Sequence, residues 1–219
     1  THFDRESNMS APEGPKVHPL QNEWVIYEQV QFHQEKDKKS GYTNSFESIC
    51  KFKTVEGFWM NWNRIPTVTQ LFYDGETRII KRVDERFPDY RPKDIRIEGQ
   101  SLFKAGIQPL WEDPMNCKGG ELRAQFDVSV HDKLGKFWET IVFSMIGETL
   151  DESDEICGAR ILDKSKPTKK TISYRLEIWF KTWNDKELKQ RLEKKVLSIC
   201  NDYKFEKVPI SFEQHTEKW

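Results

Sequence analysis

An aromatic ring followed directly by a carboxylate occurs at Trp111 and Glu112. The pair lies between Pro109 and a double glycine at 119–120, and this spacing of breakers predicts a loop. A ring can stack on a nucleobase, and a carboxylate can accept hydrogen bonds from both the N1–H and the N2 amino group of guanine. Taken alone, a tryptophan near a turn more often serves packing, and a glutamate beside it more often faces water. The pair is therefore a hypothesis for purine recognition that needs support from other residues.

A predicted strand at residues 173–180 supplies a second group of candidates. Because side chains alternate along a strand, one face carries the apolar residues Leu176, Ile178 and Phe180. The other face carries Arg175, Glu177 and Trp179, which places a cation beside an indole, as a phosphorylated purine would require. Four lysines precede this strand and could hold phosphates as point charges: Lys164, Lys166, Lys169 and Lys170. By themselves these lysines would indicate only a solvated hairpin loop.

Motifs of common enzyme classes are missing from the sequence, which contains no GxxxxGK[ST], GxGxxG, GxSxG or HExxH. The five histidines are isolated from one another and from the cysteines, so no metal-ligand spacing exists. The acidic cluster at 151–155 is better explained as a solvated turn. We expect free thiols at the four widely spaced cysteines, Cys50, Cys117, Cys157 and Cys200. The sequence thus predicts no catalytic centre, no metal and no cofactor.

The composition restricts the class of protein that must position these residues. The chain has 219 residues and no internal linker, which favours one domain. Its 35 basic and 36 acidic residues give a net charge of −1, which argues against coating DNA but allows a local basic pocket. Eight tryptophans and 14 phenylalanines indicate a packed core. The apolar runs are too short for a membrane span or a signal peptide, so we expect a globular protein of the cytoplasm or nucleus.

The hydrophobic patterns predict an α+β fold, a single curved antiparallel sheet backed by about three helices. Strands are expected at 23–30, 46–53, 122–130, 157–163, 172–183 and 208–212. Helices are expected after Thr54 as N-cap, at 137–150, and after an N-cap pairing of Asn184 with Glu187. Residues 1–17 are expected to form a flexible tail that precedes a domain at 18–219. The segment 66–99 has seven basic and seven acidic residues, which predicts a charged surface loop or insertion.

Short strings in a fixed order resemble one known family. The first are His18-Pro19-Leu20-Gln21-Asn22 with Trp24, Val55-Glu56 and Phe58-Trp59. The later ones are Ser101-Leu102-Phe103-Lys104, Trp111-Glu112-Asp113, Gly119-Gly120, Phe137-Trp138, Ile146-Gly147-Glu148 and Cys157-Gly158-Ala159. In order and spacing they resemble the eukaryotic translation initiation factor 4E family from about His18 to about His215. The resemblance implies a site on the concave side of the sheet that binds the 7-methylguanosine cap at the 5′ end of mRNA.

The resemblance also implies how the base is held. The family places the methylated base between two aromatic rings, which align with Trp111 and with Tyr42, while Phe46 is the alternative to Tyr42. Glu112 aligns with the carboxylate that recognises guanine, and Trp179 aligns with the indole that contacts the N7-methyl group. Methylation makes the base cationic, so stacking gains a cation–π contribution over ordinary guanine.

The phosphate contacts implied by the resemblance are less regular. The family's arginine after the double glycine falls on Glu121, which would repel a phosphate, so Arg123 on the same strand face is expected to take its role. The remaining phosphate contacts are expected among Lys164, Lys166, Lys169, Lys170 and Arg175.

On the convex side, the family binds helical peptides of scaffold proteins and repressors. The residues that align with this surface are His18, Pro19, Val55, Trp59, Ile141, Val142 and Ile146. Val55 and Trp59 share a helical face, as a groove for an amphipathic peptide requires. Trp59 could instead serve core packing, a role for which Trp62 is the other candidate. The glutamate that the family uses here falls on Thr140, next to Glu139.

The resemblance implies a non-enzymatic factor that binds capped mRNA and recruits a scaffold protein of the initiation factor 4G type for translation. The factor is expected to be a monomer on its own and to bind neither DNA nor membranes. A cap-binding repressor or storage factor is the alternative. A cap-hydrolysing enzyme is a minor one, because the helix at 186–199 offers only Glu187 and Glu193 for magnesium. The charged segment, Tyr42 and the short tail after His215 indicate a divergent paralogue, and the long insertion resembles those of kinetoplastid members of the family.

Overall fold

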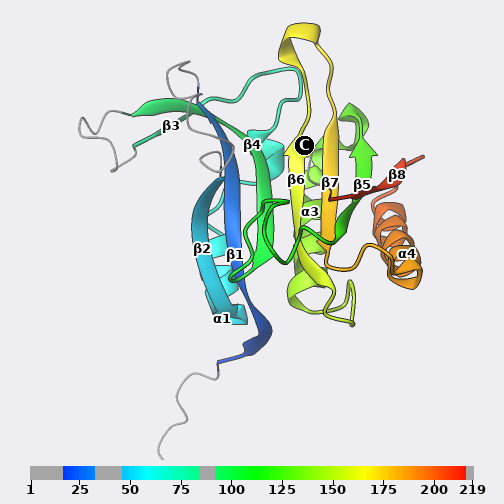
Figure 1. Ribbon diagram of the computed structural model, residues 1–219. Helices are drawn as coiled ribbons and strands as arrows, with labels where there is room; N and C mark the ends of the chain where they lie inside the picture. The colour runs from blue at the N-terminus through cyan, green and yellow to red at the C-terminus, as the bar shows by residue number, and fades with distance from the viewer. Residues whose placement is uncertain (1–16, 33–45, 84–91, 216–219) are drawn as a thin grey trace, which may run out of the picture.

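Eight antiparallel strands form one curved sheet in the computed structural model, which describes residues 17–32, 46–83 and 92–215 (Figure 1). The strands are β1 (Pro19–Phe32), β2 (Phe46–Thr54), β3 (Ile80–Arg82), β4 (Lys93–Lys104), β5 (Gly120–Phe126), β6 (Ile156–Asp163), β7 (Tyr174–Phe180) and β8 (Ile210–Gln214). Their spatial order is β2-β1-β4-β6-β7-β5-β8, and β3 pairs with the N-terminal end of β4, at residues 93–95. The predicted α+β class with a single curved antiparallel sheet is confirmed.

Four α-helices accompany the sheet in the described part of the chain: α1 (Val55–Trp62), α2 (Val68–Leu71), α3 (His131–Ile146) and α4 (Lys186–Asp202). Figure 1 shows α3 behind β6 and β7, and α4 beside β5 and β8. Thr54 caps α1 as predicted, because its hydroxyl accepts a hydrogen bond from the Gly57 N–H at 3.0 Å. The cap of α4 is Asp185 and not Asn184, since the Asp185 carboxylate accepts from the Leu188 N–H at 2.8 Å.

The hydrophobic core lies between the helices and one face of the sheet. Its largest fully buried side chains include Trp24, Phe58, Phe72, Phe137 and Trp138. From α3 and α4 the core receives residues at helical spacing, namely Leu134, Phe137, Trp138, Ile141, Val142, Met145, Leu188, Leu192 and Val196. With this face covered, the side chains that alternate with the core residues of the strands point to the opposite, open face.

The charge of segment 66–99 predicts a surface loop or insertion, whereas its described residues, 66–83 and 92–99, include parts of the sheet. They contain α2, β3 and half of β4, and they bury Val68, Leu71, Phe72, Ile95 and Ile97. Their charge is accommodated by ion pairs: Arg96 Nη2 lies 2.6 Å from Asp163 Oδ2. Arg82 lies 2.7 Å from Glu28 and 2.9 Å from Glu47. A charged segment can thus extend a sheet when each buried charge has a partner.

Smaller corrections concern where elements begin and end. The strand expected to run to residue 130 ends at Phe126, and Val128–Val130 form a 3-10 turn that leads directly into α3. Helix α3 therefore begins at His131, earlier than predicted, and ends at Ile146. The four cysteines are free, as expected. The predicted flexible tail at 1–17 lies almost wholly outside the described residues. No helix in the described part of the chain is long and apolar enough to cross a membrane.

Candidate functional site

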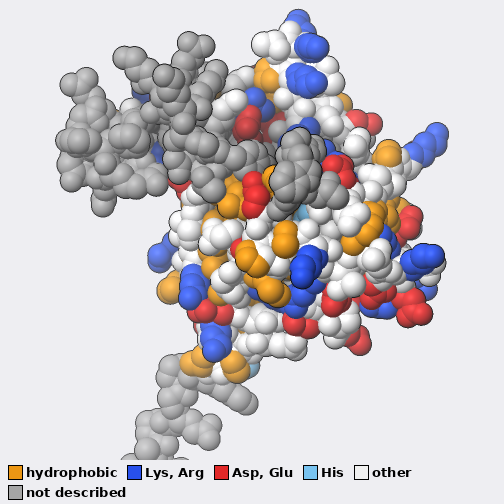
Figure 2. Space-filling model, viewed as in Figure 1, with side chains coloured by type: hydrophobic (Ala, Val, Ile, Leu, Met, Phe, Trp, Pro, Cys, Tyr) orange, Lys and Arg blue, Asp and Glu red, His pale blue; other side chains and the backbone are white. Residues whose placement is uncertain are grey.

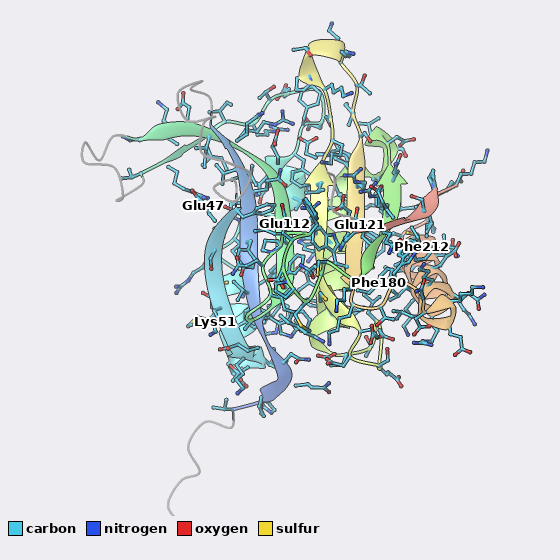
Figure 3. All side chains as sticks on the ribbon, in the orientation of Figure 1. Glu47, Lys51, Glu112, Glu121, Phe180 and Phe212 are labelled. Atoms are coloured by element: carbon cyan, nitrogen blue, oxygen red, sulfur yellow. The ribbon has the colours of Figure 1, made fainter. Side chains whose placement is uncertain are left out.

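A cavity of about 490 Å³ opens on the sheet face that the helices leave uncovered. It is lined by Trp111, Glu112, Glu121, Arg123, Arg160, Lys164, Arg175, Trp179, Glu213, Gln214 and His215. Figure 2 views this face, on which acidic, basic and apolar side chains lie close together. Figure 3 shows Glu112 and Glu121 over the central strands, far from Lys51 on the edge strand β2. The structure therefore brings together most of the residues predicted to recognise a base and its phosphates.

The loop that carries Trp111 and Glu112 is held by its own hydrogen bonds. Asp113 accepts from the backbone N–H of Gln108 at 2.8 Å and from that of Met115 at 2.9 Å. The buried Asn116 amide donates to the carbonyls of Gln108 and Leu110, both at 2.8 Å. These bonds fix both sides of the loop, so Trp111 and Glu112 are presented at the cavity without depending on a ligand.

His215 ties this loop to the last strand, a role that sequence reasoning missed. Its backbone N–H donates to the Gly119 carbonyl at 3.1 Å, and its ring Nδ1 lies 2.9 Å from the Asn116 carbonyl. The same ring is centred 4.4 Å from that of Trp179. Because its partners are distant in the chain, no local spacing could have marked this histidine as part of the site.

Trp179 forms part of the cavity wall, and its ring is enclosed by other groups. The Phe103 ring meets it edge to face at a centroid distance of 5.5 Å. The Arg160 guanidinium lies over the indole, with its central carbon 4.7 Å from the ring centroid. Trp111 packs against the same apolar cluster, which also contains Tyr27. The two tryptophans predicted to contact a base therefore belong to one continuous aromatic and apolar surface.

Glu121 lies in the cavity as an ion-paired group. It pairs with Arg123, and its Oε2 lies 3.3 Å from Nε2 of His215. Burial raises the pKa of Glu121, but the hydrogen bond with His215 and the charges of Arg160 and Arg123 more than offset this, so that its pKa is lowered. Arg123 also pairs with Glu213. The cation expected to replace the family's arginine is thus already shared by two carboxylates.

The predicted phosphate ligands divide into two groups. Lys164 and Arg175 line the cavity. The pKa of Lys164 is lowered, first by desolvation and then by the neighbouring charge of Arg175, and Glu177 acts in the opposite direction. Lys166, Lys169 and Lys170 are exposed on the β6–β7 hairpin and do not line the described cavity. In Figure 2 the basic side chains at the tip of this hairpin project away at the top of the view.

The two candidates for the second base-stacking ring are Tyr42 and Phe46. Tyr42 lies outside the described residues. Phe46 is the first residue of β2 and is half-buried, and it is not among the described residues that line the cavity.

The convex surface carries exposed apolar residues of α1. Trp59 is 41% exposed, and Val55 and Met60 are exposed beside it. The Trp59 ring meets the Phe143 ring of α3 at 5.4 Å. Trp62 instead packs on the core, stacked on Phe58 at 5.3 Å with its Nε1–H donating to Glu139 at 3.0 Å.

The other residues predicted on this surface differ in exposure. His18 and Pro19 are exposed, and the His18 ring lies 2.6 Å from Glu56 at the start of α1. Ile146 is half-buried. Ile141 and Val142 correct the prediction, because both are 0% exposed and face the core from the inner side of α3. They have no surface to offer to a partner.

No group of three or more His, Cys, Asp or Glu side chains that could hold a metal ion occurs among the described residues. In the acidic turn after α3, Asp154 pairs with Lys104 and with Lys181, and Asp151 lies 3.5 Å from Arg191. These two aspartates therefore already have cationic partners within the protein.

Comparison with known proteins identifies the fold and the family. The family model described as "Eukaryotic initiation factor 4E" matches residues 19–83 and 90–219. The initiation factor 4E of Bos taurus is 32% identical over 171 residues, which cover 76% of this chain and 66% of the relative. For the Drosophila melanogaster factor 4E1 the identity is 29%, and the share of the relative is 52%. The chain thus spans between about half and two thirds of the length of these two relatives.

Solved structures share the fold. Ascaris suum eIF4E-3, in complex with an m2,2,7G cap, superposes with a TM-score of 0.69 at 22% identity, covering 93% of this chain and 94% of that one. Caenorhabditis elegans eIF4E-3, in complex with the 4E-binding protein Mextli, has a TM-score of 0.65 at 21% identity, with coverages of 92% and 96%. With a family model that matches most of its length, the chain belongs to the eukaryotic initiation factor 4E family.

Proposed function

We propose that the cavity binds the 7-methylguanosine cap of mRNA and that the protein does not hydrolyse it. The observation that carries the proposal is the position of Trp111 and Glu112 on a loop fixed at the mouth of a cavity whose wall contains Trp179. A ring, a carboxylate and a second indole are the groups that a cationic purine needs. The solved complexes of Ascaris suum eIF4E-3 with m2,2,7G and m7G caps support the proposal.

In this proposal the binding energy of the base comes from stacking on an aromatic ring and from the positive charge of the methylated base. Stacking on Trp111 contributes about 1–3 kcal/mol, and the positive charge of the methylated base adds about 0.5–2 kcal/mol of cation–π attraction. Glu112 is exposed in the described structure and accepts the N1–H and N2 donors of guanine. Tyr42 closes the second face of the base as a prediction from the resemblance, with Phe46 as the alternative. Lys164 and Arg175 bind the phosphates, while Arg123 contributes less because Glu121 and Glu213 already share its charge.

Fluorescence titration tests this function. We expect 7-methyl-GTP to quench the intrinsic tryptophan fluorescence at concentrations at which GTP quenches far less, because Trp111 and Trp179 lie in the cavity. Equal quenching by the two nucleotides would contradict the proposed recognition. The same mixtures, incubated with magnesium and analysed for free nucleotide, test the absence of hydrolysis, since release of nucleotide would identify an enzyme.

We propose further that α1 and the outer surface of α3 bind an amphipathic helical peptide of a scaffold protein, as an initiation factor would require. The exposed Trp59 ring, with Val55 and Phe143 beside it, supplies the apolar anchor. The Caenorhabditis elegans eIF4E-3 complex with Mextli supports a partner of this kind. Trp59→Ala should weaken capture of a peptide from a 4E-binding protein at least ten-fold and leave the quenching by 7-methyl-GTP unchanged.

The matched control is Val128→Ala, which removes an exposed apolar side chain from another part of the surface. Peptide binding that survives in Trp59→Ala, or is lost equally in Val128→Ala, would contradict the assignment of the surface. A loss of 7-methyl-GTP binding in Trp59→Ala would show instead that this residue supports the fold.

A further inference from the structure

Strand register places the charged residues of the cavity in two neighbouring rows. In one row Trp179 of β7 is paired with Gly158 of β6 and with Glu121 of β5. In the next row Glu177 is paired with Arg160 and with Arg123. Because side chains two residues apart share a face, both rows point into the cavity. Glu177 therefore lies between the indole of Trp179 and the guanidinium groups of neighbouring arginines.

Glu177 is 0% exposed, so its charge is stable only if its partners compensate for lost hydration. Oε2 accepts from Arg160 Nε and from the Trp179 Nε1–H, the latter at 3.3 Å. Oε1 lies 2.7 Å from Arg175 Nε, an ion pair without hydrogen-bond geometry. One carboxylate thus contacts the indole expected to meet the methyl group and a guanidinium expected to meet the phosphates.

These contacts have two consequences for the cavity. The indole has a single N–H, so its bond to Glu177 fixes the rotation of the ring, while Arg160 covers one of its faces at 4.7 Å. Arg160 and Arg175 both pair with this one carboxylate, and Lys164 lies nearby. Glu177 thus limits the positive charge next to the indole, where a cationic base must bind, while these basic side chains remain available to phosphate.

We propose that Glu177 is the positioning residue of the site: it orients the Trp179 indole for the methylated base and holds Arg160 and Arg175 for the phosphates. This inference rests on the proposed cap binding, and it adds a buried residue that itself contacts no ligand. Glu177 contacts both the indole expected to bind the base and the arginines expected to bind the phosphates. Loss of its charge should therefore weaken the preference for the methylated base and strengthen the attraction for phosphate.

The experiment is a titration of Glu177→Gln with 7-methyl-GTP and GTP at low and high salt. The amide keeps the shape but removes the charge and weakens the acceptor for the indole. We expect the preference for 7-methyl-GTP over GTP to fall about ten-fold, in line with the loss of a hydrogen bond to a charged group. We also expect the salt dependence of 7-methyl-GTP binding to become steeper, because one negative charge is lost next to Arg160 and Arg175.

Glu98→Gln is the matched control. Glu98 lies on β4 near Lys164 and Arg96, so its substitution removes the same charge on the same side of the molecule without changing the acceptor of Trp179. It should steepen the salt dependence and retain the preference for the methylated base. If both variants lose the preference for 7-methyl-GTP over GTP equally, the effect of Glu177 is one of charge alone and the proposal is overturned. An unchanged preference in Glu177→Gln would overturn it as well.

Two further measurements separate this inference from the proposed function. In the absence of ligand, the Nε1–H NMR signal of Trp179, identified by its absence in Trp179→Phe, should move upfield in Glu177→Gln, whereas an unmoved signal overturns the positioning role. If wild-type protein fails to distinguish the two nucleotides, the cap-binding proposal is contradicted and the NMR comparison decides the role of Glu177. If Glu177→Gln does not fold, Trp179→Phe replaces it, because a preference retained without the ring N–H overturns the inference.

Discussion

The two faces of the β-sheet bury different kinds of side chain. The face under the helices buries a large apolar cluster that includes Trp24, Phe58 and Trp138. The open face buries Glu121, Arg160 and Glu177, and each of these lies against a group of opposite charge. Apolar burial stabilises a fold directly, whereas a buried ion pair often contributes no more than an apolar pair of similar volume. We therefore expect the helix-covered face to contribute most of the stability, and the open face to carry the proposed binding site.

The first prediction compares two adjacent aromatic residues of α1 and carries the largest expected effect. Phe58 is 1% exposed and lies in the core, so Phe58→Ala should lower the free energy of unfolding by about 3–5 kcal/mol. Trp59→Ala should cost far less, because much of that ring is already in water. Urea denaturation followed by circular dichroism measures both. Similar losses in the two variants would show that the convex surface is part of the core.

The second prediction concerns recognition on the open face. Glu112→Gln should weaken 7-methyl-GTP binding by about 1.5–3 kcal/mol, since the amide is a weaker acceptor and presents donors to the donors of guanine. Glu112 is exposed, so the unfolding free energy should stay within about 0.5 kcal/mol of wild type. Isothermal calorimetry and denaturation in the same buffer check the two parts. Undiminished affinity would remove Glu112 from the site.

The third prediction separates the two groups of lysines. Lys164→Ala should weaken 7-methyl-GTP binding by about 1 kcal/mol at low salt, because Lys164 lines the cavity. Lys169→Ala should have an effect near zero, because this exposed lysine is on the hairpin tip. Titrations at two salt concentrations measure the difference. A larger loss in Lys169→Ala would mean that the hairpin closes over the ligand.

The smallest expected effect concerns acid stability. The folded protein lowers the pKa of Glu121 below its ordinary value of 4.5, so ionised Glu121 stabilises the fold above that pH. This stabilisation is lost as the pH falls through the lowered pKa. Unfolding free energies measured from about pH 6 to about pH 3 should therefore decline less steeply in Glu121→Gln than in wild type. Parallel curves would contradict the pairing of Glu121 with Arg123 and His215.

Local patterns were sufficient to predict the parts of the fold that depend on neighbouring residues. The cap at Thr54, the two-residue alternation from Arg175 to Trp179 and the breakers around Trp111 all act within a few positions. They correctly predicted α1, the outward face of β7 and a loop at 107–119. The α+β class was predicted because the expected strands and helices do not alternate as βαβ units along the chain.

The missed features depend on contacts between distant segments. The charge of segment 66–99 suggested a surface loop, because a local pattern cannot show that Asp163 would neutralise Arg96. Ile141 and Val142 were expected on the surface from the resemblance, although the helical spacing of α3 turns them inward. The sequence did not predict that the cavity would include Arg160, Glu213 and His215. These residues reach the cavity only because β6 pairs with β7 and β8 pairs with β5.

The anchoring of the Trp111 loop by His215 makes the end of the final strand a latch for the ligand-reading loop. Strand β8 lies at the edge of the sheet, paired with β5 alone, so this latch could be removed with little loss of core. Substitution of His215 by alanine is therefore expected to loosen this loop and weaken binding of the proposed ligand, while thermal unfolding stays cooperative and the circular dichroism spectrum is unchanged.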